Sequence, residues 1–293
     1  MRKDDARAIL VGIDGSPGSE AALCWAYTTA QLEDRPVTAL LGWTADGLPR
    51  PVYQTAVNAD YLGLMKAAEQ TLNRVIAQVP MPDPPIELSR LVVADEPVKA
   101  LADQARNAAM TVIGPRGPGI AHHILTGSMV QQLLHGRTSP VVVVRSPGSA
   151  GGPRDRRPVV VGVDGSAPSH AAVRWALTQA TERKVSLRLV QAYRIHVTPL
   201  GPPLVGYYAS LRQEAERLLA DVVATDIGED AAVETQRIAV DEFPSRGLLD
   251  TARDAQLLVV GSRGLGGFAE LVLGSTAHQC VLHAPCPVAV LRG

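Results

Sequence analysis

The sequence lacks the features of a disulfide-stapled, secreted or membrane-spanning protein. Its three cysteines, Cys24, Cys280 and Cys286, form neither a CxxC pair nor a paired framework, which favours buried thiols in a reducing compartment. No run of about 18 apolar residues is present, and the first residues have no signal-peptide core. We therefore expect a cytoplasmic protein with no membrane partner.

The sequence also lacks an excess of charge of either sign. Its 28 Lys and Arg residues stand against 29 Asp and Glu residues, for a formal net charge of −1 at pH 7. Nucleic acids and anionic membranes reward clusters of basic side chains, so we expect no nucleic-acid partner. The one local basic run, at 154–158, lies among Gly, Ser and Pro, as is typical of a solvated linker.

Two long segments of the chain occur twice. "ILVGIDGSPGSEAALCWA" at 9–26 matches "VVVGVDGSAPSHAAVRWA" at 159–176, and "MTVIGPRGPGIAHHILTGSMV" at 110–130 matches "LLVVGSRGLGGFAELVLGSTA" at 257–277. Two repeats of this length indicate a tandem domain duplication, because a solenoid needs several shorter ones.

The segment between the two copies has the composition of a linker. Residues 147–157 are rich in Gly, Ser, Pro and charge, which is typical of a flexible connection. We therefore predict a first domain at 1–146 and a second at 158–293.

Short β-branched runs alternate with helix-length segments in both halves. The runs are too apolar for strands with one wet face, which predicts strands buried on both sides of a parallel sheet. Such alternation, with right-handed crossovers, predicts an α/β fold. We expect two tandem doubly wound (Rossmann-like) domains, each an open five-stranded parallel sheet with helices on both faces. The expected strands are 8–14, 37–43, 86–93, 110–114 and 140–145, then 158–164, 185–193, 233–240, 257–261 and 287–292.

An aspartate follows the first expected strand of each half. Asp14 stands in "GIDGS" and Asp164 in "GVDGS". In open parallel sheets, ligands bind beyond the carboxyl ends of the strands, where the strand order reverses. A carboxylate there can accept hydrogen bonds from a ligand, but Asp and Ser also cap helices and turns. The pattern leaves both roles open.

A glycine pattern, Gly-x2-Gly-x9-Gly-Ser, follows the fourth expected strand of each half. Glycine lets the backbone approach a ligand without a Cβ in the way. The Gly-Ser step opens a helix whose free N–H groups and positive dipole end suit a phosphate chain. The pattern comprises Gly114, Gly117, Gly127 and Ser128 in the first half, and Gly261, Gly264, Gly274 and Ser275 in the second.

These motifs, with the terminal "HAPCPVAVLR" at 283–292, resemble the universal stress protein family in its tandem two-domain form. The likeness covers nearly the whole chain, and in that family the glycine pattern marks members that bind ATP. The resemblance therefore implies ATP as ligand, with Mg²⁺ carried by the nucleotide. It implies that Asp164 faces the adenosine, that Gly261 and Gly264 wrap the ribose and phosphates, and that Gly274, Ser275 and Thr276 hold the phosphates.

The first half departs from this pattern. Its matching positions are Asp14, Gly114, Gly117, Gly127, Ser128 and Met129. Pro115 and Pro118 each remove a backbone donor and fix φ, and Met129 has no hydroxyl to match Thr276. We therefore expect the first site to be the weaker of the two. Arg116 and Arg263 lie inside the two loops and can meet phosphate charge or point to solvent.

The sequence favours binding over catalysis. It contains no Walker loop, no kinase HRD or DFG element and no GxSxG elbow. Phosphoryl transfer depends on placed cations and a placed nucleophile, so we expect slow ATP hydrolysis at most. His122, His123 and His278 have no carboxylate or cysteine at ligand spacing, which favours surface or packing roles and no protein metal site.

Three functions remain open. The first is an ATP-binding regulator of stress response or dormancy with an unknown protein partner, the second a slow ATPase or autophosphorylating enzyme, and the third a nucleotide-free scaffold. The last strands are apolar, and an apolar edge invites pairing. Because family members associate through this strand, we expect an intrachain pseudo-dimer of the two halves, and a homodimer.

Overall fold

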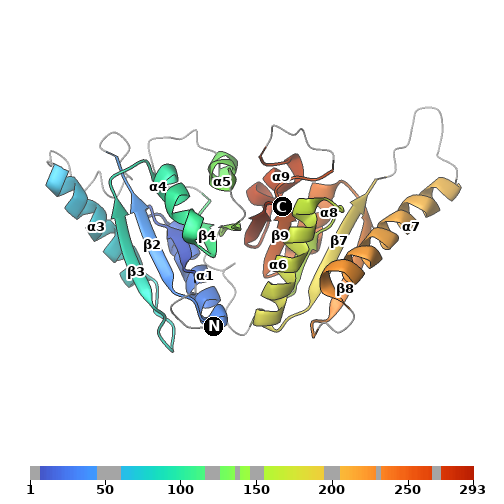
Figure 1. Ribbon diagram of the computed structural model, residues 1–293, viewed down its shortest axis with the longest axis horizontal. Helices are drawn as coiled ribbons and strands as arrows, with labels where there is room; N and C mark the ends of the chain where they lie inside the picture. Colours follow the sequence, from blue (N-terminus) through green and yellow to red (C-terminus); the bar gives the residue numbers. More distant parts are fainter. Residues whose placement is uncertain are drawn as a thin grey trace. The chain divides into compact units, whose positions relative to one another are not determined.

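The computed structural model describes residues 7–44, 61–115, 126–135, 139–145, 155–194, 205–228, 232–265 and 272–293. The chain divides into two compact units, Met1–Arg154 and Asp155–Gly293. Each unit alternates strands and helices along the chain (Figure 1).

The first unit is a five-stranded parallel sheet in the order β3-β2-β1-β4-β5. Helices α1 and α3 contact each other on one side of it, and α4 and α5 contact each other on the other. The strands are β1 (Ile9–Gly12), β2 (Val37–Gly42), β3 (Leu88–Val93), β4 (Met110–Ile113) and β5 (Val141–Val143). The helices are α1 (Pro17–Glu33), α3 (Tyr61–Gln78), α4 (Pro97–Gln104), a 3₁₀ turn (Ala105–Asn107) and α5 (Thr126–Leu134).

The second unit repeats this order as β10-β9-β6-β7-β8, again with parallel pairs. Its strands are β6 (Val159–Gly162), β7 (Leu187–Tyr193), β8 (Thr235–Asp241), β9 (Leu257–Gly261) and β10 (Val288–Leu291). Its helices are α6 (Ala167–Arg183), α7 (Val205–Val222), a π turn (Val223–Ile227), α8 (Pro244–Thr251), a 3₁₀ turn (Ala252–Asp254) and α9 (Ser275–His283). The predicted doubly wound α/β fold is confirmed in both halves.

The core of each unit lies on its central strands. Val159, Val160 and Val161 of β6 are fully buried, as are Ile9 and Val11 of β1. Helices cover the sheet on both faces, so these strands have no polar side and read as continuous apolar runs.

The prediction that every strand is buried on both faces is wrong for β3 and β8. Ser89 and Arg90 of β3 are exposed, and so is Arg237 of β8. Each of these strands ends the strand order of its unit, and within the described residues it pairs with a single neighbour, β2 or β7. Position at the edge of the sheet, which local hydrophobicity does not encode, decides their exposure.

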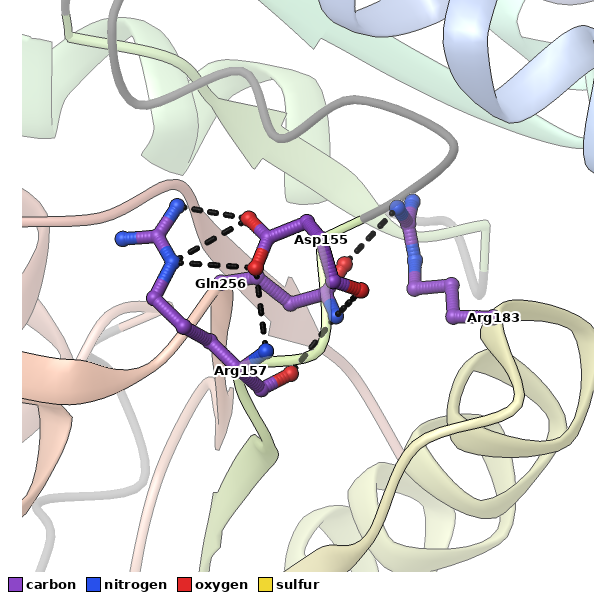
Figure 2. Close-up of polar contacts among 4 residues, drawn as sticks. All are labelled: Asp155, Arg157, Arg183 and Gln256. Atoms are coloured by element: carbon purple, nitrogen blue, oxygen red, sulfur yellow. Dashed lines mark hydrogen bonds and ion pairs between the residues drawn. The ribbon is translucent and has the colours of Figure 1, made fainter.

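A polar network fixes the start of the second unit (Figure 2). The Gln256 amide donates to the carbonyl oxygens of Arg157, at 2.6 Å, and Asp155, at 3.4 Å, while Arg183 donates to its Oε1 at 3.3 Å. The Arg157 guanidinium pairs with the Asp155 carboxylate at 2.7 Å. Residues 155–157, expected in the linker, are thus bonded to the residue that precedes β9.

Candidate functional site

A cavity of about 350 Å³ lies at the carboxyl ends of β6, β7 and β9. Strand β6 pairs with β7 on one side and with β9 on the other, so the chain first runs outward from β6 in one direction and later returns to its other side. The cavity therefore lies at the point where the strand order reverses. The volume falls in the range of ligand pockets, about 300–1,000 Å³. The cavity is lined by Gly162, Val163, Asp164, Ser169, Val190, Gln191, Ala192, Pro244, Leu248, Val260, Gly261, Ser262, Arg263, Gly264, Leu265, Gly274, Ser275, Thr276 and Ala277.

The Asp-Gly-Ser motif builds the turn that leads from β6 into α6. Asp164 Oδ1 accepts hydrogen bonds from Ser166 N at 3.0 Å and from Ser166 Oγ at 2.6 Å. Gly165 has φ +79°, a left-handed conformation that favours glycine. Ser166 caps α6, because its Oγ accepts from Ser169 N at 3.3 Å. Asp164 therefore shapes the turn and lines the cavity as well.

The same turn occurs in the first unit. Ser16 N donates to Asp14 Oδ1 at 2.9 Å, and Gly15 has φ +80°. Ser16 caps α1 by accepting from Ser19 N at 3.2 Å. The capping role that the sequence left open is thus present in both halves.

The second oxygen of Asp164 holds the glycine-rich loop. Leu265 N donates to Asp164 Oδ2 at 3.2 Å. A Cβ at Gly264 would lie 2.3 Å from the same oxygen, so a larger residue would displace the carboxylate. Because Gly264 has no Cβ, the backbone of the loop can lie directly against the Asp164 carboxylate.

Gly261 and Gly114 have a packing role. A Cβ at Gly261 would lie 3.0 Å from the carbonyl carbon of Pro168, at the start of α6. A Cβ at Gly114 would lie 2.5 Å from the carbonyl carbon of Gly18, at the start of α1. In both halves this glycine lets the fourth strand pack against the first helix, and Gly261 also lines the cavity.

Gly274 is different, because no residue in the described part of the chain crowds it. Its φ of −73° and ψ of 162° are open to any residue, and a Cβ there would lie 3.5 Å from Arg263 Cα, at ordinary contact distance. Gly274 N donates to Ser262 O at 2.7 Å, which ties the residue to the end of β9. The fold therefore leaves room for a side chain at 274.

Helix α9 begins at the cavity. Gly274 is its N-cap and brings no side chain to satisfy the first N–H groups. Ser275, Thr276 and Ala277, the first turn of α9, all line the cavity. Free N–H groups and the positive end of a helix dipole favour an anion, so this end of the cavity suits phosphate.

No sequence motif predicted the apolar wall of the cavity. Val190 and Ala192 at the end of β7, and Pro244 and Leu248 of α8, line it. Gly162 makes room for this wall, since a Cβ there would lie 3.0 Å from Leu248 Cδ1. These residues carry no polar or glycine signature. The usable signal was the topology, because β7 pairs with β6 and must end beside Asp164.

Of the predicted first site, Gly117 lies outside the described residues, and so do Arg116, Pro118, His122 and His123 of the same segment. Gly127 and Ser128 belong to the first turn of α5, and Met129 of the same helix is half-buried. Asp14 and Gly114 follow β1 and β4, the counterparts of β6 and β9. The described positions thus occupy the elements that match those of the second site.

No cysteine and no histidine of the described residues is among the residues that line the cavity. Cys280 and Cys286 are buried, and burial raises the pKa of each thiol to about 12. Cys24 is half-buried, and burial raises its pKa as well. Within the described residues, no group of three or more His, Cys, Asp or Glu is placed to hold a metal ion. No helix of that part of the chain is long and apolar enough to cross a membrane.

Solved structures place the fold among known proteins. A universal stress protein from Archaeoglobus fulgidus covers 98% of this chain and 96% of its own, with 19% identity and a TM-score of 0.67. A universal stress protein in complex with cAMP covers 47% of this chain and 97% of its own, with 24% identity and a TM-score of 0.37.

Sequence relatives cover the chain from end to end. A universal stress protein of Mycolicibacterium smegmatis is 32% identical over 291 residues, which is 97% of this chain and 96% of the relative. The sequence model of the Universal stress protein family matches twice, at residues 6–145 and 155–292. The chain therefore belongs to the universal stress protein family and carries its domain in two tandem copies.

Proposed function

We propose that this protein binds ATP in the cavity of its second unit and acts as a nucleotide-dependent regulator in stress response or dormancy. The observation that carries the proposal is the cavity at the end of β6 and β9, which has Asp164 in its lining and the first turn of α9 at one end. A hydrogen-bond acceptor and an anion site in one cavity suit a nucleoside joined to phosphates.

The lining suggests how ATP lies. Val190, Ala192 and Leu248 form an apolar wall, which suits the faces of a base. Asp164 can accept a hydrogen bond from the adenosine, and Gly261 and Gly264 leave backbone beside the ribose and phosphates. The phosphates, with Mg²⁺, lie at Gly274, Ser275 and Thr276, where Arg263 adds positive charge.

Calorimetry tests the proposal with one matched variant. Gly274→Ala places a methyl group where the fold has room but where phosphate is expected. We expect Mg-ATP to bind the wild-type chain and to bind Gly274→Ala at least about tenfold more weakly, a difference of about 1.4 kcal/mol. Mass spectrometry of ligand released from the protein as purified identifies the natural occupant; a ligand other than a nucleotide would count against ATP.

The proposal extends to output and assembly. We propose that binding, and not turnover, is the function, so that purified protein releases no more phosphate from ATP than Gly274→Ala does. We also propose a cytoplasmic protein whose two halves associate through their last strands, β5 and β10, as a pseudo-dimer, and which forms a homodimer. Light scattering gives the molar mass, and a monomer at micromolar concentration would exclude the homodimer.

A further inference from the structure

We propose that Asp164 is a positioning residue that holds the loop after β9 to the cavity, and that a ligand donor exchanges with the backbone N–H of Leu265 at the Asp164 carboxylate. The proposal rests on the proposed function in taking the ligand to be a nucleoside triphosphate. It adds a coupling: occupation of the cavity releases Leu265 from Asp164.

The two carboxylate oxygens of Asp164 accept hydrogen bonds from different parts of the chain. Oδ1 accepts from the backbone and hydroxyl of Ser166, at 3.0 and 2.6 Å, which keeps the turn into α6. Oδ2 accepts from Leu265 N at 3.2 Å. Asp164 and Leu265 lie 101 positions apart in the chain, so this bond joins the end of β6 to the loop that follows β9.

Within the described residues, packing contributes little to the position of Leu265, because the residue is 77% exposed. Gly264 lies against Asp164 so closely that a Cβ would be 2.3 Å from Oδ2. The same segment is also held two residues earlier, where Ser166 Oγ donates to the Arg263 carbonyl oxygen at 3.3 Å. The bond to Asp164 Oδ2 is the described hydrogen bond that holds Leu265 itself.

A ligand donor competes for the same oxygen. Asp164 lines the cavity, and one side of Oδ2 already faces Gly264 while Leu265 N donates to it. A bond from a hydroxyl to a carboxylate is shorter and stronger, at about 2.5–2.7 Å, than the 3.2 Å bond from Leu265. A ribose hydroxyl therefore replaces the backbone donor, while the Ser166 bonds at Oδ1 keep the turn intact.

The positioning role is tested without ligand, on the full chain. Amide hydrogen exchange at Leu265 is followed by NMR in wild type, Asp164→Asn, Gly264→Ala and Ser16→Ala. An asparagine has one acceptor oxygen where the carboxylate has two, so it cannot serve both Ser166 and Leu265. We expect exchange at Leu265 to quicken on the order of tenfold in Asp164→Asn and also to quicken in Gly264→Ala. Ser16→Ala, which removes a helix cap in the first unit, should match wild type at Leu265.

The exchange step is tested by adding ligand. We expect Mg-ATP to quicken exchange at Leu265 while it slows exchange in the first turn of α9. Inorganic tripolyphosphate, which lacks ribose and base, should slow exchange in α9 and leave Leu265 unchanged. Slower exchange at Leu265 with ATP would overturn the competition, and unchanged exchange in ligand-free Asp164→Asn would overturn the positioning role.

The positioning role of Asp164 can be tested even if the proposed function is wrong. If calorimetry detects no ATP binding, the proposed function and the exchange step both fall. The ligand-free comparison of Asp164→Asn with Ser16→Ala still decides whether Asp164 positions Leu265. Circular dichroism and thermal unfolding of each variant show whether the fold is kept, and Gly264→Ala gives a second route to the same bond if Asp164→Asn does not fold.

Discussion

The glycines of the motif are present for different physical reasons. At Gly261 and Gly264 a side chain would meet protein atoms, at 3.0 and 2.3 Å respectively, while at Gly274 it would meet them at 3.5 Å. The first two are required by the fold and by Asp164, whereas Gly274 is not. The described residues impose no such requirement at Gly274, and we attribute the glycine there to the proposed ligand.

Alanine substitutions separate these reasons. Gly261→Ala forces a methyl group against the backbone at the start of α6 and should lower the free energy of unfolding by about 1–3 kcal/mol. Gly274→Ala should change it by less than about 0.5 kcal/mol. Chemical denaturation of both variants measures the difference; equal losses of stability would show that the two positions are not distinct.

Asp155 gives the second unit a pH dependence. Burial raises the pKa of its carboxyl, but the hydrogen bonds and charge of Arg157 outweigh burial and hold the pKa below its ordinary value. A carboxyl with a lowered pKa stabilises the fold above its unfolded pKa, about 3.9, and this contribution is lost as pH falls through the folded pKa. Asp155→Asn should therefore lose less stability than wild type as pH falls below about 4. Denaturation curves at a series of pH values test this, and parallel curves would contradict it.

The thiols should differ in reactivity. Because thiolate is the reactive form, Cys280 and Cys286, whose pKa values burial raises to about 12, should resist iodoacetamide at pH 8 in the folded protein. Cys24 is half-buried and should be alkylated first. Peptide mass spectrometry of a time course shows the order, and early labelling of Cys286 would contradict the burial of this thiol.

At the scale of elements, local sequence patterns indicated some of the residues that line the cavity and not others. Strand-helix alternation and the glycine spacing located Asp164, Gly264 and α9, because turns and helix starts have local signatures. The apolar wall at Val190 and Leu248 has no local sequence signature, because apolar residues of this kind occur throughout the core. The exposure of β3 and β8 was not predicted for a related reason. The position of a strand at the edge depends on the order of all strands in the sheet and not on its own sequence.

Two serines cap the corresponding first helices of the two units. Ser16 and Ser166 begin α1 and α6 in the same way, and replacement of either by alanine should lower the free energy of unfolding by about 1 kcal/mol. Ser166 also bonds Asp164 Oδ1 through its hydroxyl. We therefore expect Ser166→Ala, and not Ser16→Ala, to weaken ATP binding to the second site. Calorimetry and denaturation of both variants measure this, and equal affinities would argue against a role for the Ser166 hydroxyl.

At the scale of the whole molecule, duplication has given two copies of one domain with different loops. Where the second unit has Ser262 after Gly261 the first has Pro115 after Gly114, and where the second has Thr276 the first has Met129. A proline offers no N–H to a ligand and a methionine no hydroxyl. The copies share a fold, and we expect the second to bind phosphate more strongly.

This asymmetry predicts unequal effects of equal mutations. Gly274→Val and Gly127→Val replace the matching glycine before the last helix of each half. We expect Gly274→Val to remove more nucleotide binding than Gly127→Val, as measured by equilibrium dialysis with labelled ATP. Equal losses would refute the ranking of the two sites, while the fold of each variant is checked by circular dichroism.

The most direct test of the central claim is calorimetric titration of the wild-type chain with Mg-ATP. The account predicts saturable binding that Gly274→Ala weakens at least about tenfold without loss of stability. Absence of binding at millimolar ATP, or equal binding by Gly274→Ala, would contradict the claim that the cavity between Asp164 and α9 is a nucleotide site.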